Sequence, residues 1–121
     1  MNAEVRDLHR RAEAAVDAAL LARSSGDTVG ARAALLEALE LERCAAELTP
    51  DDREPTHSTL CLGAAALALE CGDREEASRL ATAGLAGRPS PEVRGELERF
   101  ARGEGFAGVE GASDSDPKAD S

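Results

Sequence analysis

The chain has 121 residues, a formal net charge of -10 and only two aromatic residues, both phenylalanine. This length suits one domain with a modest core. The acidic balance argues against nucleic-acid binding, because phosphate contacts supply most of the sequence-independent affinity and need a basic face. Alanine is the commonest residue and has the highest intrinsic helix propensity, so we expect an all-α fold.

The first half of the chain predicts two helices. The first runs from about Glu4 to Arg23, and its apolar stripe at three- and four-residue spacing consists of Val5, Leu8, Ala12, Ala15, Ala19 and Ala22. Gly26 ends this helix and Asp27 can cap the next, since these residue types are favoured at those positions. The second helix runs from about Thr28 to Leu48. Its predicted inward residues are Ala31, Ala34, Leu35, Ala38, Leu39, Ala45, Ala46 and Leu48.

The second half of the chain predicts three further helices. A polar connector, Thr49 to Pro55, precedes a helix from Pro55 to Cys71. The centre of this helix, Leu60 to Leu69, is apolar on every side, and such a helix is normally buried all round. A second Gly-Asp turn, Gly72-Asp73, then leads to a helix from about Arg74 to Ala86.

A fifth helix is predicted from the start signal Ser90-Pro91-Glu92, with serine as cap, proline in the first turn and an acid beside it. It reaches about Arg102 and presents one apolar face. Glycine, serine and aspartate dominate the rest of the chain. We therefore expect a helical domain over residues 1–103 and a disordered acidic tail over residues 104–121.

The two Gly-Asp turns also mark a repeat. A small residue follows five positions after each turn glycine, and a small residue with leucine follows at twelve and thirteen positions. These matches are Ala31 and Ala38-Leu39 after Gly26, and Ala77 and Gly84-Leu85 after Gly72. With this register and the closing Pro89, residues 13–90 resemble the tetratricopeptide repeat family. The resemblance implies a right-handed superhelix of about five antiparallel helices, the fifth a solvating cap. The alternative is a generic helical bundle.

The sequence departs from this family in two ways. The two turn glycines lie 46 residues apart, against a usual repeat of about 34. The large aromatic residues of the family pattern are replaced by alanine. The second helix and its connector are therefore longer than in an ordinary repeat.

The resemblance also implies a ligand surface, because family members bind along the concave face formed by the first helix of each pair. The residues on that face by register are Glu13, Val16, Leu20, Arg23, Thr59, Leu62, Ala66, Leu69 and Glu70. Most are aliphatic, so the implied partner is a protein or peptide that offers an apolar helix or extended segment, including a second copy of this chain.

Three residues are the candidates for chemistry. His57 and Cys61 are four residues apart on one predicted helix, and Cys44 could approach them if the connector folds back. Such a group would suit a metal ion or an activated thiol. The alternative is that the cysteines fill the core and His57 is a polar residue at the helix start. His9, among charges on the first helix, is expected to face solvent.

The sequence has no glycine-rich phosphate loop, nucleophile elbow or HExxH motif. We therefore expect no catalysis, no cofactor and no metal. The leading hypothesis is a non-catalytic protein–protein interaction module, an adaptor or regulatory subunit that binds a partner segment in an apolar concave groove. The alternatives are a self-associating structural protein that forms a homodimer and, third, a thiol or metal-dependent enzyme.

The sequence also predicts where the chain works. Its first residues lack the basic-then-apolar pattern of a secretory signal. The longest apolar run, residues 60–69, is too short to cross a bilayer, and three cysteines without CxxC spacing suit a reduced compartment. We expect a cytoplasmic protein without a membrane partner. The bias toward arginine, alanine and glycine suggests a bacterial source.

Overall fold

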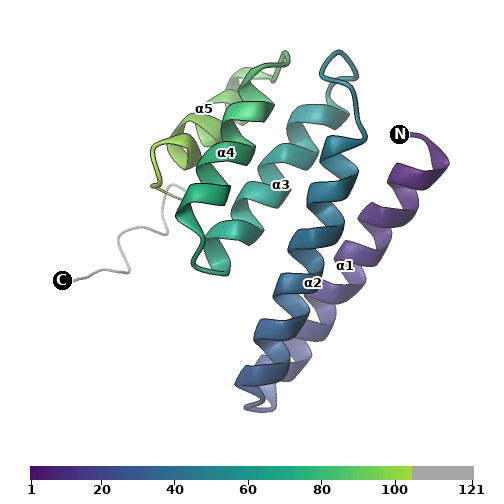
Figure 1. The fold of residues 1–121 in the computed structure, drawn as a ribbon, viewed down its shortest axis with the longest axis vertical. Helices are drawn as coiled ribbons and strands as arrows, with labels where there is room; N and C mark the ends of the chain where they lie inside the picture. Colours follow the sequence, from purple (N-terminus) through teal and green to yellow (C-terminus); the bar gives the residue numbers. More distant parts are fainter. Residues whose placement is uncertain (105–121) are drawn as a thin grey trace.

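The computed structural model describes residues 1–104 of the chain, which form five α-helices (Figure 1). The helices are α1 (Ala3–Ser24), α2 (Thr28–Glu47), α3 (Thr56–Glu70), α4 (Arg74–Leu85) and α5 (Pro91–Ala101). No strand occurs within this range, so the all-α prediction is confirmed. Each observed helix end lies within one residue of its prediction. Residues 105–121, nearly all of the predicted acidic tail, lie outside the described residues.

Glycines at the two predicted hairpin corners set the turns. Gly26 and Gly72 have φ values of +83° and +82°, which residues with a side chain rarely adopt. Each follows a helix and closes it in the same way, since the N–H of the next aspartate donates to the carbonyl five residues back. Asp27 and Asp73 then cap the following helices by accepting from Gly30 and Glu76 backbone N–H groups at 2.8 and 3.0 Å.

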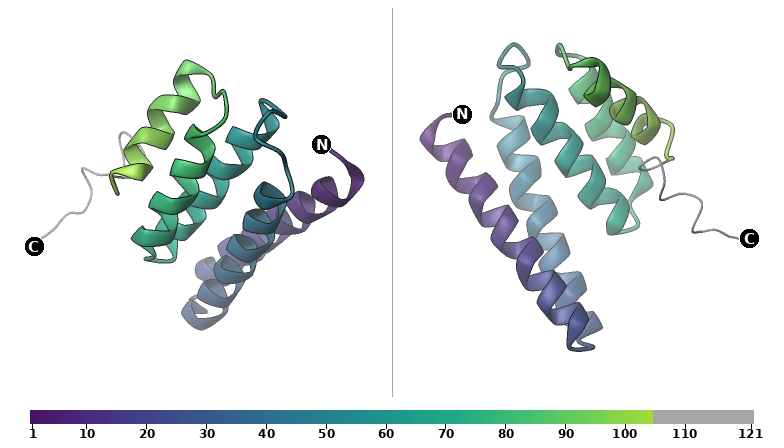
Figure 2. Two further views of the ribbon diagram at one scale, coloured as in Figure 1. Left: turned by 45° about the horizontal axis from the view of Figure 1, so that its top comes forward. Right: turned by 180° about the vertical axis from the view of Figure 1, so that it is seen from behind.

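Each helix packs antiparallel against the next, and α5 packs against both α3 and α4. The chain therefore builds an array from α1 at one edge to α5 at the other (Figures 1 and 2). Seen from behind, α1 and α3 lie on either side of α2, which is farther from the viewer (Figure 2, right). α1 packs mainly on α2. It shares small apolar clusters with α3, through Val5 near Leu60 and through Ala19 near Cys71.

Alanine lines most of the helix contacts. Ala12, Ala15 and Ala19 of α1 are buried, as are Ala38 and Ala45 of α2. The α3–α4 contact repeats the pattern with the fully buried residues Ala64, Ala65, Ala68, Ala77 and Ala81. Because a methyl group reaches only a short distance, these faces gain dispersion contacts only when the helices lie close together.

The α1–α2 hairpin is longer than the α3–α4 hairpin, so its turn projects beyond the rest of the array (Figure 1). The contact between the α1–α2 hairpin and α3 ends near Arg32, whose guanidinium donates to the carbonyl of Cys71 at the end of α3 at 3.2 Å. Beyond that point the hairpin exposes apolar side chains: Leu21 is 72% exposed and Val29 is 81% exposed.

Two packing predictions are wrong. Leu48 was expected to face inward but is 46% exposed, because α2 ends at Glu47 and the chain turns away. The centre of α3 was expected to be buried all round, yet Leu62, Ala66, Leu67 and Leu69 are only partly buried. For Ala66 and Leu67 the physical reason is that α1 packs mainly on α2 and leaves one side of α3 uncovered. None of the helices in residues 1–104 combines the length and apolar character that a membrane crossing requires.

Gly84 provides a test of the close packing around α4. A Cβ at this position would lie 2.9 Å from the Cβ of Cys61 and 3.0 Å from a methyl of Leu97. Overpacking of this kind costs about 1–3 kcal/mol, whereas replacing a helical glycine by alanine returns at most about 1 kcal/mol. We expect Gly84→Ala to lower the free energy of unfolding, measured by urea denaturation.

Gly95→Ala is the matched control, because a Cβ on this α5 residue meets no atom within 4 Å. It should raise the free energy of unfolding by about 0.5–1 kcal/mol. If Gly84→Ala proved as stable as Gly95→Ala, the close α3–α4–α5 packing described above would be incorrect.

Candidate functional site

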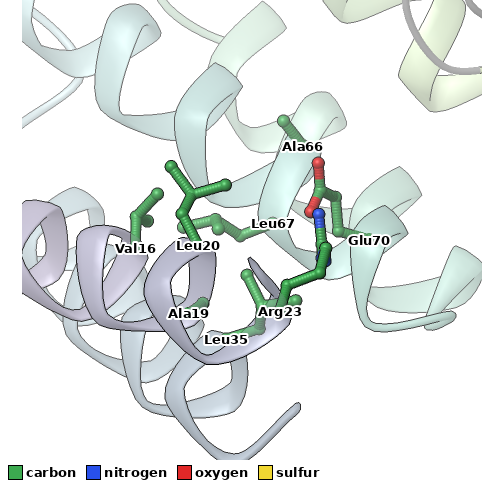
Figure 3. A pocket seen from close by; sticks show the side chains of 8 residues that line it. All are labelled: Val16, Ala19, Leu20, Arg23, Leu35, Ala66, Leu67 and Glu70. Carbon is green, nitrogen blue, oxygen red and sulfur yellow. The ribbon is translucent and has the colours of Figure 1, made fainter. Parts of the chain in front are cut away.

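A groove lies between α1 and α3, with α2 as its floor. It encloses about 130 Å³ and is lined by Val16, Ala19, Leu20, Arg23, Leu35, Ala66, Leu67 and Glu70 (Figure 3). We call this the α1–α3 groove. Its centre is aliphatic, and Leu20 on its rim is 55% exposed although it is a large apolar side chain.

The structure brings five of the nine predicted partner-binding residues into this groove: Val16, Leu20, Arg23, Ala66 and Glu70. Glu13 lies one turn before Val16 on α1, outside the lining residues, and Thr59 is exposed on α3. Leu62 and Leu69 are turned away and pack partly buried against the α3–α4–α5 core. The groove is thus lined by most of the residues predicted on α1 but by only two of the residues predicted on α3.

Three lining residues were not among the predicted binding residues. Ala19 and Leu35 were expected only as core residues, and both are buried at the base of the groove. Leu67 takes the place expected for Leu69. Leu67 lies four residues after Gly63, on the side of α3 that faces α2, but the sequence of this uniformly apolar helix does not distinguish that side from the others.

A buried carboxylate from α2 lies against the groove face of α1, nearer the N-terminus of α1 than the groove. Glu42 of α2 is 6% exposed, and its Oε1 lies 2.9 Å from Nδ1 of His9. A Cβ on Gly63 of α3 would stand 2.9 Å from Oε2 of Glu42, so the carboxylate occupies space that a side chain on α3 would fill. Nε2 of His9 lies 3.4 Å from Glu13. His9 was expected to face solvent; it is instead held between two carboxylates.

The pKa values of Glu42 and His9 are both raised, although burial and pairing act against each other at each residue. Burial raises the pKa of Glu42 above its ordinary value, and the hydrogen bond from His9 only partly opposes this. Burial opposes protonation of His9, but the hydrogen bond and charge of Glu42, with the charge of Glu13, outweigh it and raise the pKa of His9. The pair therefore holds protons more tightly in the folded chain than in the unfolded one.

The opposite end of the groove carries Arg23 and Glu70. Figure 3 shows both charged groups extending toward the same end of the pocket, one from α1 and one from α3. No ion pair or hydrogen bond of the Arg23 guanidinium occurs within residues 1–104. The groove thus has an aliphatic centre between two charged ends.

The three candidate residues for chemistry do not come together, because Cys44 lies apart from His57 and Cys61. Sγ of Cys61 lies 3.7 Å from Nε2 of His57, and both residues are buried. Cys44 is elsewhere, with its thiol 3.9 Å from Glu40 on the outer side of α2. Burial raises the pKa of Cys61 to about 11, which opposes a thiolate near neutral pH. Among the described residues, no three of His, Cys, Asp and Glu lie together as a metal site would need.

A second hollow of about 410 Å³ lies between the start of α1 and the connector after α2. Its lining carboxylate, Glu54, is already engaged, because it accepts from Ser58 N–H and Oγ at 2.9 Å and from Arg88 N–H at 2.6 Å. These bonds tie the start of α3 to the α4–α5 loop. The role of this carboxylate is therefore structural.

Comparisons with protein-family models, with curated proteins and with solved structures find no match.

The His9–Glu42 pair predicts how stability depends on pH. A raised pKa for His9 means that its contribution to the free energy of unfolding is complete below its ordinary value of 6.5 and is lost as pH rises through the folded value. The raised pKa of Glu42 also makes the free energy of unfolding fall as the pH rises, and this loss begins near its ordinary value of 4.5. We expect urea denaturation to show that the wild type loses stability as the pH rises above about 6.5.

His9→Gln should flatten this dependence, because the amide still donates to Glu42 but does not titrate. Equal losses of stability in wild type and variant over the same pH range would show that His9 does not carry the effect.

Proposed function

We propose that this chain is a non-catalytic protein–protein interaction module that binds an apolar helical segment of a partner in the α1–α3 groove. The observation that carries the proposal is the exposed Leu20 beside Val16, Ala66 and Leu67, with the buried Leu35 beneath them. A helix in a groove is a common way for helical proteins to recognise a partner. A segment with aliphatic residues at three- and four-residue spacing fits this surface.

The charged ends of the groove support the same function. A partner helix with an apolar stripe would bury Leu20 and Val16, which supplies affinity. Arg23 and Glu70 at one end, and Glu13 with His9 at the other, would fix its direction and register. This division between an apolar centre and a polar rim is typical of protein interfaces.

The fold component of the proposal is a tetratricopeptide-like array of two hairpins and a capping helix. Two features support it: the antiparallel order of the helices, and the packing of α5 on both helices of the second hairpin. The wide groove is the feature that departs from a regular array, in which the first helices of successive hairpins pack together.

A non-catalytic role is supported by the state of the candidate groups. Both ring nitrogens of His9 face carboxylates, so neither is directed at an open site. Cys61 is buried and its thiol pKa is raised. These residues are better suited to packing and to hydrogen bonding with buried polar groups than to proton transfer or nucleophilic attack.

Leu20→Glu tests the groove directly. Losing a buried leucine contact removes about 1.5–3 kcal/mol, and every 1.4 kcal/mol is a factor of about ten in affinity. We expect Leu20→Glu to bind at least about tenfold more weakly, without loss of fold, because the side chain is exposed. The measurement is quantitative capture by the immobilised chain from a cell extract, followed by titration of each captured protein.

Leu21→Glu is the matched control. Leu21 is 72% exposed on the same helix but points away from the groove and is not among its lining residues. Binding that survives Leu21→Glu and is lost in Leu20→Glu would support the proposal. If both variants behave alike, the α1–α3 groove is not the binding surface.

A further inference from the structure

The groove face of α1 is self-complementary. Four residues on it, Glu13, Val16, Leu20 and Arg23, are spaced by three, four and three positions, symmetrically about position 18. If the same face of a second α1 is laid antiparallel on the first, Val16 meets Leu20 of the other copy. Glu13 likewise meets Arg23 of the other copy. The three–four spacing places these residues on one seam of the helix, as antiparallel helix pairs require.

We infer that the occupant of the α1–α3 groove is α1 of a second copy of this chain, which gives a twofold symmetric dimer. The inference rests on the proposed function and names its partner. A twofold interface uses one patch on both subunits, so the patch must complement itself. Two central aliphatic pairs flanked by two opposite-charge pairs satisfy this condition.

The charges on this face are available for the pairing. The Glu13 side chain is 67% exposed, and within the described part of the chain its one ion pair is the 3.4 Å approach to His9. Within residues 1–104, the Arg23 guanidinium has no hydrogen bond or ion pair, and it stands at the open end of the groove (Figure 3). In the dimer each guanidinium would gain the Glu13 carboxylate of the other copy while Glu70 of its own copy remains beside it.

The apolar residues also favour a second copy. Leu20 is 55% exposed, whereas leucine is normally buried. Docking of the second α1 would cover Leu20 of both chains at once and extend the hydrophobic surface of Val16, Ala66 and Leu67.

Two features limit the strength of the dimer. Asp17 is exposed beside the twofold axis, so the two copies bring like charges near each other at the rim. One helix face per subunit also buries less than the roughly 1,600 Å² of a standard interface. We therefore expect a dimer that dissociates on dilution.

Charge reversal tests the pairing by sedimentation velocity over a concentration series of the full chain. Glu13→Arg places two arginines opposite each other in each flanking pair, and Arg23→Glu places two glutamates there. Each single variant should dimerise at least about tenfold more weakly than wild type. Both positions are exposed, so both variants should remain folded by circular dichroism.

Two samples should regain dimerisation only if the interface has this twofold symmetry. The double variant Glu13→Arg with Arg23→Glu restores opposite charges within its own dimer. A one-to-one mixture of the two single variants restores them in a heterodimer. Both samples should recover dimerisation to near the wild-type level, whereas each single variant alone does not.

The inference is overturned if wild type is a monomer at every concentration, or if the charge-reversal variants dimerise as strongly as wild type. It is also overturned if the single variants are weakened but neither the double variant nor the mixture recovers. If wild type is a monomer while capture of another protein still depends on Leu20, this inference fails and the proposed function stands. If neither self-association nor capture depends on Leu20 or the charges, both fail.

Discussion

The close packing of alanine faces between α1 and α2 is the constraint on which the groove depends. Methyl groups such as those of Ala12, Ala15 and Ala38 gain contact only where the helix backbones are near each other. α1 therefore makes nearly all its contacts with one neighbour, and α3 packs on α2 and α4 instead. If larger side chains filled this contact, α1 and α2 would lie farther apart, and α1 would take a different position relative to α3. The open face of α1 and the uncovered side of α3 are two results of the same packing.

The His9–Glu42 pair adds a polar contact to this arrangement. The carboxylate of Glu42 lies against Gly63, so it occupies space where α1 and α3 could otherwise approach through apolar side chains. A buried carboxylate is costly unless it is paired, and His9 supplies that partner from α1. Toward the hairpin turn, the surface becomes aliphatic and ends at Arg23 and Glu70. One face of the hairpin thus combines the His9–Glu42 hydrogen bond, which joins α1 to α2, with an exposed apolar surface.

The helices could be predicted from the sequence, whereas the polar contacts between them could not. Apolar spacing in α1 and the glycine turns depend on neighbouring residues, which is why the helix ends agree with the structure to within one residue. The pairing of His9 with Glu42 depends on how far α1 slides along α2, which helical spacing does not determine. The rotation of α3 is set by its three neighbours, so Leu62 and Leu69 pack against the α3–α4–α5 core while Leu67 faces the groove. The α1 side of the groove was predictable because α1 has a single main neighbour.

A second copy of this chain bound in the α1–α3 groove would change the surroundings of the side chains that line it. Methyl NMR over a dilution series tests it at the level of single side chains. We expect the methyl signals of Val16, Leu20 and Leu67 to move with concentration, while those of the buried Leu80 and Leu97 stay fixed. Concentration-dependent shifts confined to residues outside the groove, or no shifts at any concentration, would contradict it.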